Sequence, residues 1–510
     1  MGSECLIDTI ADGEMNRVKA LCSNSKRRMT TAFFIMICLC LVLFVEGALA
    51  EAPGTGRALT DRKAAVIQMM NLNLRYILQT WWHAEKDFVY AAATNMNSDQ
   101  QLTEERTLAI KDSARAFADW ENADVLPILY LSREQAENGI RPVSHAIYCI
   151  SLSLYYDYYD EEIVGVPKED ALAMCIKLIR SVVEEHRSNH PDSTDDCYWG
   201  DSWQSPLWAE NIALAAWLLR DDMEPEAYAK VERMVIDEAD RLTYDFEIPY
   251  YRDAAGEIIY PGDTKGEELA WDAKILALAC VMFPDSEKTP DWNEKLERML
   301  VSATALPEDV GSERIVDGQK VGEMIEGSNV NEDGTVVNHD LIHIDYMATI
   351  LEEMGDTVAV YRIAGAPVPE AAAFNLDRIY QGLICTDLGK YDEKLAGRGF
   401  YLRNGDGQPT GDVTMPGEND WGKPGYAIYY LCDVLADTMV LDTDLEESCK
   451  ASVWEDLHFE KMSAQLYRET DGAITGQFFQ PGENAFVSGE LFMMHNLAEA
   501  YVLRYGDISE

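Results

Sequence analysis

The chain has 510 residues, of which 47% are hydrophobic, and a formal net charge of −48 at pH 7. This hydrophobic share is enough for a large core and excludes intrinsic disorder over most of the length. So strong a negative charge repels nucleic-acid phosphates and anionic lipid, so DNA and RNA are not expected as partners. It also repels polyuronic or sulphated glycans unless their binding site is locally compensated.

The N-terminal residues are typical of a targeting signal. The basic run Lys26-Arg27-Arg28 precedes a stretch without charged residues from Ala32 to Val45. Ala48-Leu49-Ala50 then offers small residues at the spacing of a signal-peptidase site. The apolar stretch is short for a membrane span, which favours a cleaved signal peptide.

We therefore interpret residues 1–50 as a signal peptide and residues 51–59 as a short linker. The mature protein is expected outside the cytoplasm, as a secreted, periplasmic or cell-surface protein. The alternative is an uncleaved signal-anchor, in which residues 31–50 tether the protein to the membrane and the basic flank stays in the cytoplasm.

Helical periodicity dominates the rest of the chain, and no Ser/Pro-rich linker divides it. One short stretch, 256–260, is a candidate for a β-hairpin strand. We predict a single all-α domain over residues 60–510. The expected helices are, in chain order, 60–94, 104–120, 133–159, 168–188, 206–220, 224–243, 264–282, 290–304, 340–354, 371–384, 424–440, 453–468 and 487–504.

Two segments, 198–219 and 260–282, resemble one another, because each runs from an aromatic-x-Gly-Asp-Ser/Thr entrance into an apolar helix. The segment 417–439 has an entrance of the same kind, and so does the stretch 331–346 that runs into the helix 340–354. Apolar helices of this sort are expected to be inner ones that alternate with polar outer helices such as 224–243. Helix hairpins in series form either an open solenoid or a closed ring. The long polar entrances favour a closed (α/α) toroid of about six or seven hairpins, with one cleft at the N-termini of the inner helices.

The richest polar cluster is "NEDGTVVNHDLIHIDY", residues 331–346. If a helix begins near Asn338, then His339, His343 and Tyr346 share one face of it. Histidine and tyrosine can act together as a general acid and base, and Asn338 can donate a hydrogen bond to a developing negative charge. The alternative is that His343 and Tyr346 are hydrogen-bonded core residues.

Two metal sites can be imagined in the same segment, and neither is favoured. "HDLIH" resembles the zinc motif HExxH, but Asp340 replaces its glutamate and no third ligand follows. A calcium loop would use Asn329, Asn331, Asp333, Gly334 and Asp340, but it lacks the usual first aspartate and last glutamate. We expect no metal and no cofactor, with a structural calcium as the alternative.

Aromatic and carboxylate side chains gather at the helix entrances, as the binding of sugar rings requires. Trp208 and Trp271 lie inside predicted helices and are more typical of core residues. No Gly-rich phosphate loop or G-x-S-x-G nucleophile motif occurs. The candidate substrate-binding residues are Trp199, Asp201, Trp203, Asp263, Glu267, Glu268, Asn329, Asn331, Asp333, Arg403, Asp420 and Trp421.

"DGTVVNHDLIHIDY" is similar to the Asp-Gly-x-x-x-x-His stretch of the heparinase-like and chondroitin-lyase-like polysaccharide lyases, in which a tyrosine follows the histidine. The "GDSW", "GDTKGEELAW" and "ENDWGKPGY" entrances resemble those of related toroidal carbohydrate-active enzymes. The resemblance implies β-elimination at a uronate, with His339 and Tyr346 as the base and acid and Asn338 neutralising the substrate carboxylate. The spacing from His339 to Tyr346 is tighter than in those lyases, and no β-sandwich region follows the helices, which favours the smaller toroidal glycoside hydrolases.

Three functions therefore remain. A polysaccharide lyase would use the His339 and Tyr346 pair on an oligo- or polysaccharide. A glycoside hydrolase would need two carboxylates about 5–5.5 Å or about 6.5–9.5 Å apart. The candidates for them are Asp263, Glu267, Glu268, Asp333 and Asp420. A glycan-binding surface protein would need neither.

The targeting segment gives a first prediction. The mature protein should begin near Glu51, because cleavage follows the Ala48-Leu49-Ala50 site. N-terminal sequencing of the exported protein measures this. Recovery of a chain that begins at Met29 from the membrane fraction would instead identify a signal-anchor.

Overall fold

In a computed structural model, the chain divides into two compact units, Met1–Arg62 and Lys63–Glu510. The elements that concern function lie in the second unit. The predicted signal peptide, the predicted helix 104–120, and the candidates Asp420 and Trp421 lie outside the described residues. Those residues are 59–81, 136–193, 198–201, 203–260, 262–415, 425–466 and 489–506.

Helices dominate these residues, as the sequence predicts. Six of them form a connected group: α5 (Ala136–Tyr155), α8 (Ser205–Leu218), α10 (Gly266–Met282), α13 (Ile344–Ala364), α15 (Tyr426–Met439) and α17 (Gly489–Tyr505). The intervening helices are α7 (Lys168–Glu184), α9 (Pro225–Asp240), α11 (Thr289–Thr304), α14 (Leu376–Cys385) and α16 (Ala451–Leu466). Three further helices are α2 (Leu59–Tyr76), α6 (Glu161–Val164) and α12 (Val321–Met324). None of the helices in this part of the chain is long and apolar enough to cross a membrane.

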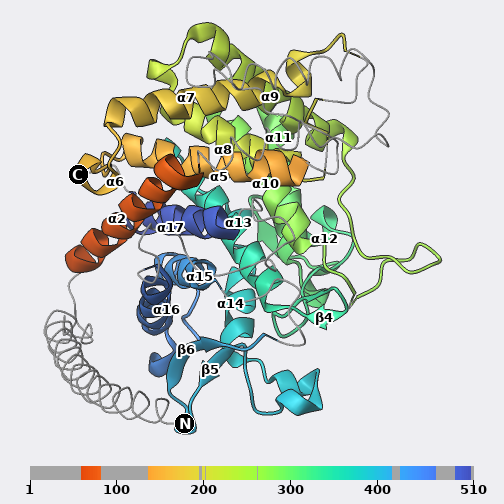
Figure 1. The fold of residues 1–510 in the computed structure, drawn as a ribbon. Helices are drawn as coiled ribbons and strands as arrows, with labels where there is room; N and C mark the ends of the chain where they lie inside the picture. Colours follow the sequence, from red (N-terminus) through yellow and green to blue (C-terminus); the bar gives the residue numbers. More distant parts are fainter. Residues whose placement is uncertain are drawn as a thin grey trace, which may run out of the picture. The chain divides into compact units, whose positions relative to one another are not determined.

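The six connected helices contact one another in chain order. α5 packs on α8, α8 on α10, α10 on α13, α13 on α15, α15 on α17, and α17 packs back on α5. The intervening helices pack against this group: α7 and α9 both contact α8, and Figure 1 draws both above it.

Burial follows the predicted alternation of inner and outer helices. α8 and α10 are buried on all sides along nearly their whole length. α9, which lies between them in the chain, buries only one face. A helix that is buried on all sides is enclosed by other elements, whereas an amphipathic one covers them, so the difference in burial predicted between these helices is confirmed.

Local sequence signals fix the helix ends. The hydroxyl of Thr264 accepts a hydrogen bond from the backbone N–H of Gly266 at 3.0 Å and so caps the start of α10. Gly365 ends α13 in the left-handed conformation, with φ of 64°. There the N–H groups of Gly365 and Ala366 bond to the carbonyls of Arg362 and Tyr361, a Schellman-type ending that glycine permits.

Within the described residues, three small antiparallel hairpins interrupt the helices. They pair β1 (Ile315–Val316) with β2 (Gln319–Lys320), β3 (Val337–Asn338) with β4 (Leu341–Ile342), and β5 (Tyr401–Arg403) with β6 (Pro409–Val413). In the predicted hairpin at 256–260, Ile258 pairs with Arg252 in an isolated antiparallel bridge.

The β3–β4 hairpin corrects the prediction that a helix begins near Asn338. His339 and Asp340 both have positive φ, 49° and 61°, which forms a tight turn and excludes a helix there. The N–H of His343 bonds to the carbonyl of Val336 at 3.1 Å, and α13 begins only at Ile344. Asparagine, histidine and aspartate tolerate this left-handed backbone better than most residues, and that signal was overlooked.

Several cysteine side chains are packed in the interior. Cys149, Cys175, Cys280 and Cys432 are buried free thiols. Each lies within a packed helix, where a free cysteine acts as a small apolar side chain.

The segment before the β3–β4 hairpin gives a second prediction. Gly334 has φ of +79°, and a Cβ there would overlap the backbone carbonyl of Arg378. Gly334→Ala should therefore lower the free energy of unfolding by about 3 kcal/mol, from backbone strain and the clash together. Chemical denaturation measures this change.

Gly256→Ala is the matched control, because Gly256 has φ of +87° and a Cβ added there would meet nothing within 4 Å. It should cost only about 1 kcal/mol, from the backbone conformation alone. Equal losses in the two variants would contradict the close approach of Gly334 to Arg378.

Candidate functional site

His339, His343 and Tyr346 meet at the N-terminus of α13. The hydroxyl of Tyr346 lies 3.3 Å from Nε2 of His339. The ring of His343 stands nearly perpendicular to both partners, with its centroid 4.7 Å from that of Tyr346 and 6.1 Å from that of His339. The structure thus brings the three predicted residues together, although through a hairpin and not on one helix face.

The hairpin explains this placement. His339 occupies the turn and is exposed, whereas His343 precedes α13 and Tyr346 lies in its first turn, and both of these are buried. The turn folds back so that the His339 ring reaches the tyrosine hydroxyl. A non-glycine residue at positive φ stores backbone strain, and such strain is common where a side chain must be held at a functional site.

Asn338 and Glu267 join the hairpin to α10. The side-chain amide of Asn338 donates to Oε1 of Glu267 at 3.1 Å. Burial raises the pKa of Glu267 to about 8, and the neighbouring carboxylate of Glu268 adds to the rise. Oε2 of Glu267 makes no hydrogen bond with the described residues. At neutral pH the group therefore holds its proton and offers an O–H donor rather than a negative charge.

Asp345 was not singled out from the sequence. Its Oδ1 accepts a hydrogen bond from the hydroxyl of Tyr429 at 2.8 Å, and its Oδ2 lies 3.9 Å from Nδ1 of His343. This contact links the start of α13 to α15. In the sequence Asp345 lies between the predicted residues His343 and Tyr346, and in the structure it stands in the first turn of α13, where an acidic side chain is favourable.

The tryptophans divide into exposed and buried side chains. Trp203 is 55% exposed and meets Trp271 edge to face, with ring centroids 5.5 Å apart. Trp199 is fully buried, and its indole N–H donates to the carbonyl of Val182 at 2.7 Å. Trp199 is therefore a core residue and not a stacking platform, which corrects the prediction. Trp208 is buried, as expected from its place inside a helix.

Asn329 is also structural. Its amide oxygen accepts from the backbone N–H of Lys265 at 3.0 Å, and its amide nitrogen donates to the carbonyl of Ser302 at 2.9 Å. With the side chain buried and both ends engaged, Asn329 cannot bind substrate or calcium in this conformation. It instead ties the 329–346 segment to the start of α10.

The other polar residues of this loop have protein partners. The amide of Asn331 donates to the hydroxyl of Thr335. Asp333 accepts hydrogen bonds from Lys390 at 2.9 Å and from the hydroxyl of Tyr391 at 2.7 Å, and these contacts hold its pKa below the usual value although partial burial opposes them. The loop thus closes as a turn held by side-chain hydrogen bonds, and the carboxylate of Asp333, one of the proposed calcium ligands, is engaged by protein groups.

The remaining candidates on the α8 and α10 entrances also contact protein groups. Asp201 forms an ion pair with Arg187 at 3.0 Å, and Glu268 pairs with Lys265 at 3.1 Å. Asp263 pairs through its backbone with Val337 of β3, which joins the α10 entrance to the hairpin.

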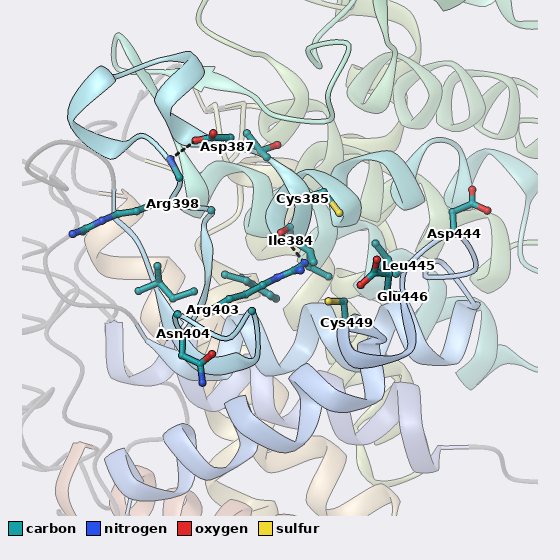
Figure 2. Close-up of a pocket in the computed structure, with 17 residues that line it drawn as sticks. Ile384, Cys385, Asp387, Arg398, Arg403, Asn404, Asp444, Leu445, Glu446 and Cys449 are labelled. Atoms are coloured by element: carbon teal, nitrogen blue, oxygen red, sulfur yellow. Dashed lines mark hydrogen bonds between the residues drawn. The ribbon is translucent and has the colours of Figure 1, made fainter.

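Arg403 lies elsewhere, in a cavity of about 910 Å³ whose lining does not include His339 or Tyr346. Figure 2 shows its side chain within this cavity, where it donates to the carbonyl of Ile384 at 3.4 Å. Arg403 is thus part of a separate pocket beside β5.

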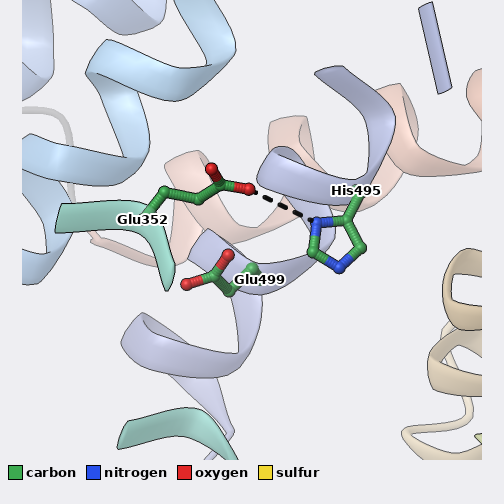
Figure 3. Close-up of side chains that lie close together, drawn as sticks. All are labelled: Glu352, His495 and Glu499. Carbon is green, nitrogen blue, oxygen red and sulfur yellow. Dashed lines mark ion pairs between the residues drawn. The ribbon is translucent and has the colours of Figure 1, made fainter. Parts of the chain in front are cut away.

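A second polar cluster, which the sequence analysis missed, is buried among the inner helices. Glu352 of α13 and His495 and Glu499 of α17 turn toward one another (Figure 3). Close by, Nζ of Lys274 contacts Asp356 and lies 2.9 Å from Glu353. The signal in the sequence was His495 and Glu499 four residues apart on a helix, which places both on one face.

The chain matches no protein-family model, no curated protein and no solved structure at a significant level. The interpretation of the site therefore depends on its own geometry.

The raised pKa of Glu267 gives a third prediction. The folded protein keeps this proton up to about pH 8, whereas the unfolded chain releases it above its ordinary value of 4.5. Between these two pH values the unfolded state binds fewer protons, so this group lowers the stability as the pH rises. Glu267→Gln removes the effect, and its melting temperature should rise relative to wild type from pH 5 to pH 8.5. Parallel pH profiles for wild type and Glu267→Gln would contradict the assignment.

Proposed function

We propose that the protein is an extracytoplasmic polysaccharide lyase that cleaves a uronic-acid-containing glycan by β-elimination. The observation that carries the proposal is the contact between Tyr346 and His339, whose hydroxyl and Nε2 lie 3.3 Å apart. A phenol and an imidazole at this distance can exchange a proton, as a general base and acid must.

In this mechanism His339 accepts the phenol proton, and the Tyr346 oxygen removes the proton from C5 of the uronate. The electron pair forms the C4–C5 double bond and the C4–O4 bond breaks. The leaving O4 takes a proton from the Tyr346 and His339 pair. The products are an unsaturated uronate and a new chain end, and no water is consumed.

The substrate carboxylate must be neutralised before its C5 proton becomes acidic. Asn338 and the protonated Glu267 supply neutral hydrogen-bond donors beside the pair, and a proton on Glu267 also removes one negative charge. The neutral state of Glu267 therefore reduces, at the site itself, the repulsion expected between a chain of net charge −48 and a polyanionic glycan. Trp203, exposed at the α8 entrance, is suited to stack on a sugar ring.

We also propose that the inner helices form a closed (α/α)6 toroid. The cyclic order of contacts from α5 through α17 and back to α5 supports this arrangement. Side-chain contacts between neighbouring entrances support a shared rim: Trp203 with Trp271, Asn338 with Glu267, and Asp345 with Tyr429. A toroid of this kind would place the proposed catalytic pair at the mouth of one cleft.

A glycoside hydrolase is the second candidate, and one observation favours it. Glu267 holds its proton up to about pH 8 and leaves Oε2 without a hydrogen bond to the described residues, as a general acid would. Asp263 and Glu268 lie on the same entrance and are the candidates for its partner carboxylate.

The fourth prediction tests the lyase. His339→Ala and Tyr346→Phe should each lower kcat by roughly 10²–10⁴-fold, because each removes one member of the proton-transfer pair. The measurement is the ultraviolet absorbance of the unsaturated uronate on a panel of uronic-acid glycans. His190→Ala and Tyr244→Phe are matched controls, because His190 stacks on Tyr198 and Tyr244 bonds to Asp291, away from the hairpin. Thermal melting checks that all four variants are folded.

Glu267→Gln separates the two enzymes. In a lyase the variant keeps a neutral hydrogen-bonding side chain and retains turnover. Wild-type activity should fall above about pH 8, where Glu267 loses its proton, and the activity of the variant should not. In a hydrolase it loses the proton donor, and activity measured as new reducing ends falls sharply. Full turnover in both His339→Ala and Tyr346→Phe would refute the lyase, and glycan binding with neither product would indicate a non-catalytic binding protein.

A further inference from the structure

The buried cluster of Glu352, His495 and Glu499 has the composition of a metal site. The three offer one nitrogen and two carboxylate oxygens, all within 4.8 Å of one another. Each side chain is at most 1% exposed. His495 and Glu499 lie one helical turn apart on α17, and Glu352 faces them from α13 (Figure 3).

The orientation of His495 is the first argument. Its Nε2 lies 3.2 Å from the amide oxygen of Asn211, an acceptor, so Nε2 carries the ring proton. Nδ1 then presents a lone pair, and it lies 3.9 Å from a carboxylate oxygen of Glu352. Two electron-pair donors that face each other in a dry interior repel unless a cation or a proton lies between them. A fixed tautomer of this kind is what a metal-binding histidine gains from a hydrogen bond to its other nitrogen.

The environment of Glu499 also favours a bound cation. It is fully buried, and neither carboxylate oxygen has a hydrogen-bond partner among the described residues. A buried carboxylate without a partner is strongly destabilising. The nearest buried cation does not serve it, because Lys274 contacts Asp356, lies 2.9 Å from Glu353 and lies 3.7 Å from Glu210.

Glu352 shows a related pattern. The side-chain amide of Asn496, in the orientation that satisfies both of its ends, donates to Oε1 of Glu352 at 3.0 Å. Oε2 of Glu352 has no hydrogen-bond partner among the described residues. Oε1 is also the oxygen that lies 3.9 Å from Nδ1 of His495, so the carboxylate that faces the imidazole is oriented by a neighbouring amide, as in carboxylate ligands supported from behind.

We propose that Glu352, His495 and Glu499 bind one divalent metal ion of the class that takes imidazole and carboxylate ligands, such as Zn²⁺ or Mn²⁺. Ligand atoms about 2.1 Å from such an ion can be at most about 4.2 Å apart, so binding would draw the three side chains slightly together. The ion would connect α13 to α17 and would be a positively charged partner for the carboxylate of Glu499. The proposal is independent of the enzymatic assignment, because none of these residues belongs to the Tyr346 and His339 site.

The fifth prediction is tested on the whole chain, purified without chelators. Elemental analysis should find close to one equivalent of zinc or manganese, and X-ray absorption should show nitrogen and oxygen neighbours without sulfur, which separates this site from the free cysteines. After removal of the ion, added Zn²⁺ or Mn²⁺ should raise the melting temperature, since a ligand that binds only the folded state stabilises it. Mg²⁺, which prefers oxygen ligands and retains its water, should have little effect.

Glu499→Gln and His495→Asn should each weaken binding of the added ion at least tenfold. Glu210→Gln is the matched control, because Glu210 is an equally buried carboxyl near Lys274 but outside the three proposed ligands, and this variant should keep the ion. Wild-type protein that holds no ion and whose melting temperature no added ion changes would overturn the proposal. A rise in melting temperature for Glu499→Gln in that case would show that the cluster holds a proton instead. If the two ligand variants fail to fold, the metal content and absorption spectrum of the wild type still decide.

Discussion

The burial of Lys274 constrains the whole interior. Its ammonium group is fully enclosed, and it contacts Asp356 and Glu353 of α13 and lies within 3.7 Å of Glu210 of α8. A buried charge is tolerated only when it is closely paired, so α8, α10 and α13 must keep one relative register. The same group also positions two neighbouring helices. His495 of α17 lies 3.8 Å from Asp356, and the hydroxyl of Tyr148 of α5 lies 3.1 Å from it.

The features that follow from periodicity were predictable from the sequence. Apolar runs such as 206–220 and 264–282 identified enclosed helices, and the amphipathic 224–243 identified an outer one. The grouping of His339, His343 and Tyr346 was also predictable, because residues so close in the chain cannot separate far. The reason offered for it was wrong, since a helix face was expected and a two-residue turn with positive φ provides the contact.

Features that depend on distant residues were not predictable in this way. Trp199 lies on the same Gly-rich turn as the exposed Trp203, yet its indole is fixed by the carbonyl of Val182 in a different segment. The partners of Asn329 likewise come from two other elements. The buried cluster was overlooked for the same reason, because Glu352 joins the pair on α17 only after the two helices have packed.

The return of α17 to α5 has a consequence for the order in which the protein folds. α17 follows every other inner helix in the chain, yet it packs between α15 and α5. The interior therefore stays open, with acidic groups in contact with water, until α17 has been synthesised and has docked. Contacts between segments so far apart in sequence form slowly, because a long loop must close before they can form. A chain with this topology completes its core only once α17 has been synthesised and has docked.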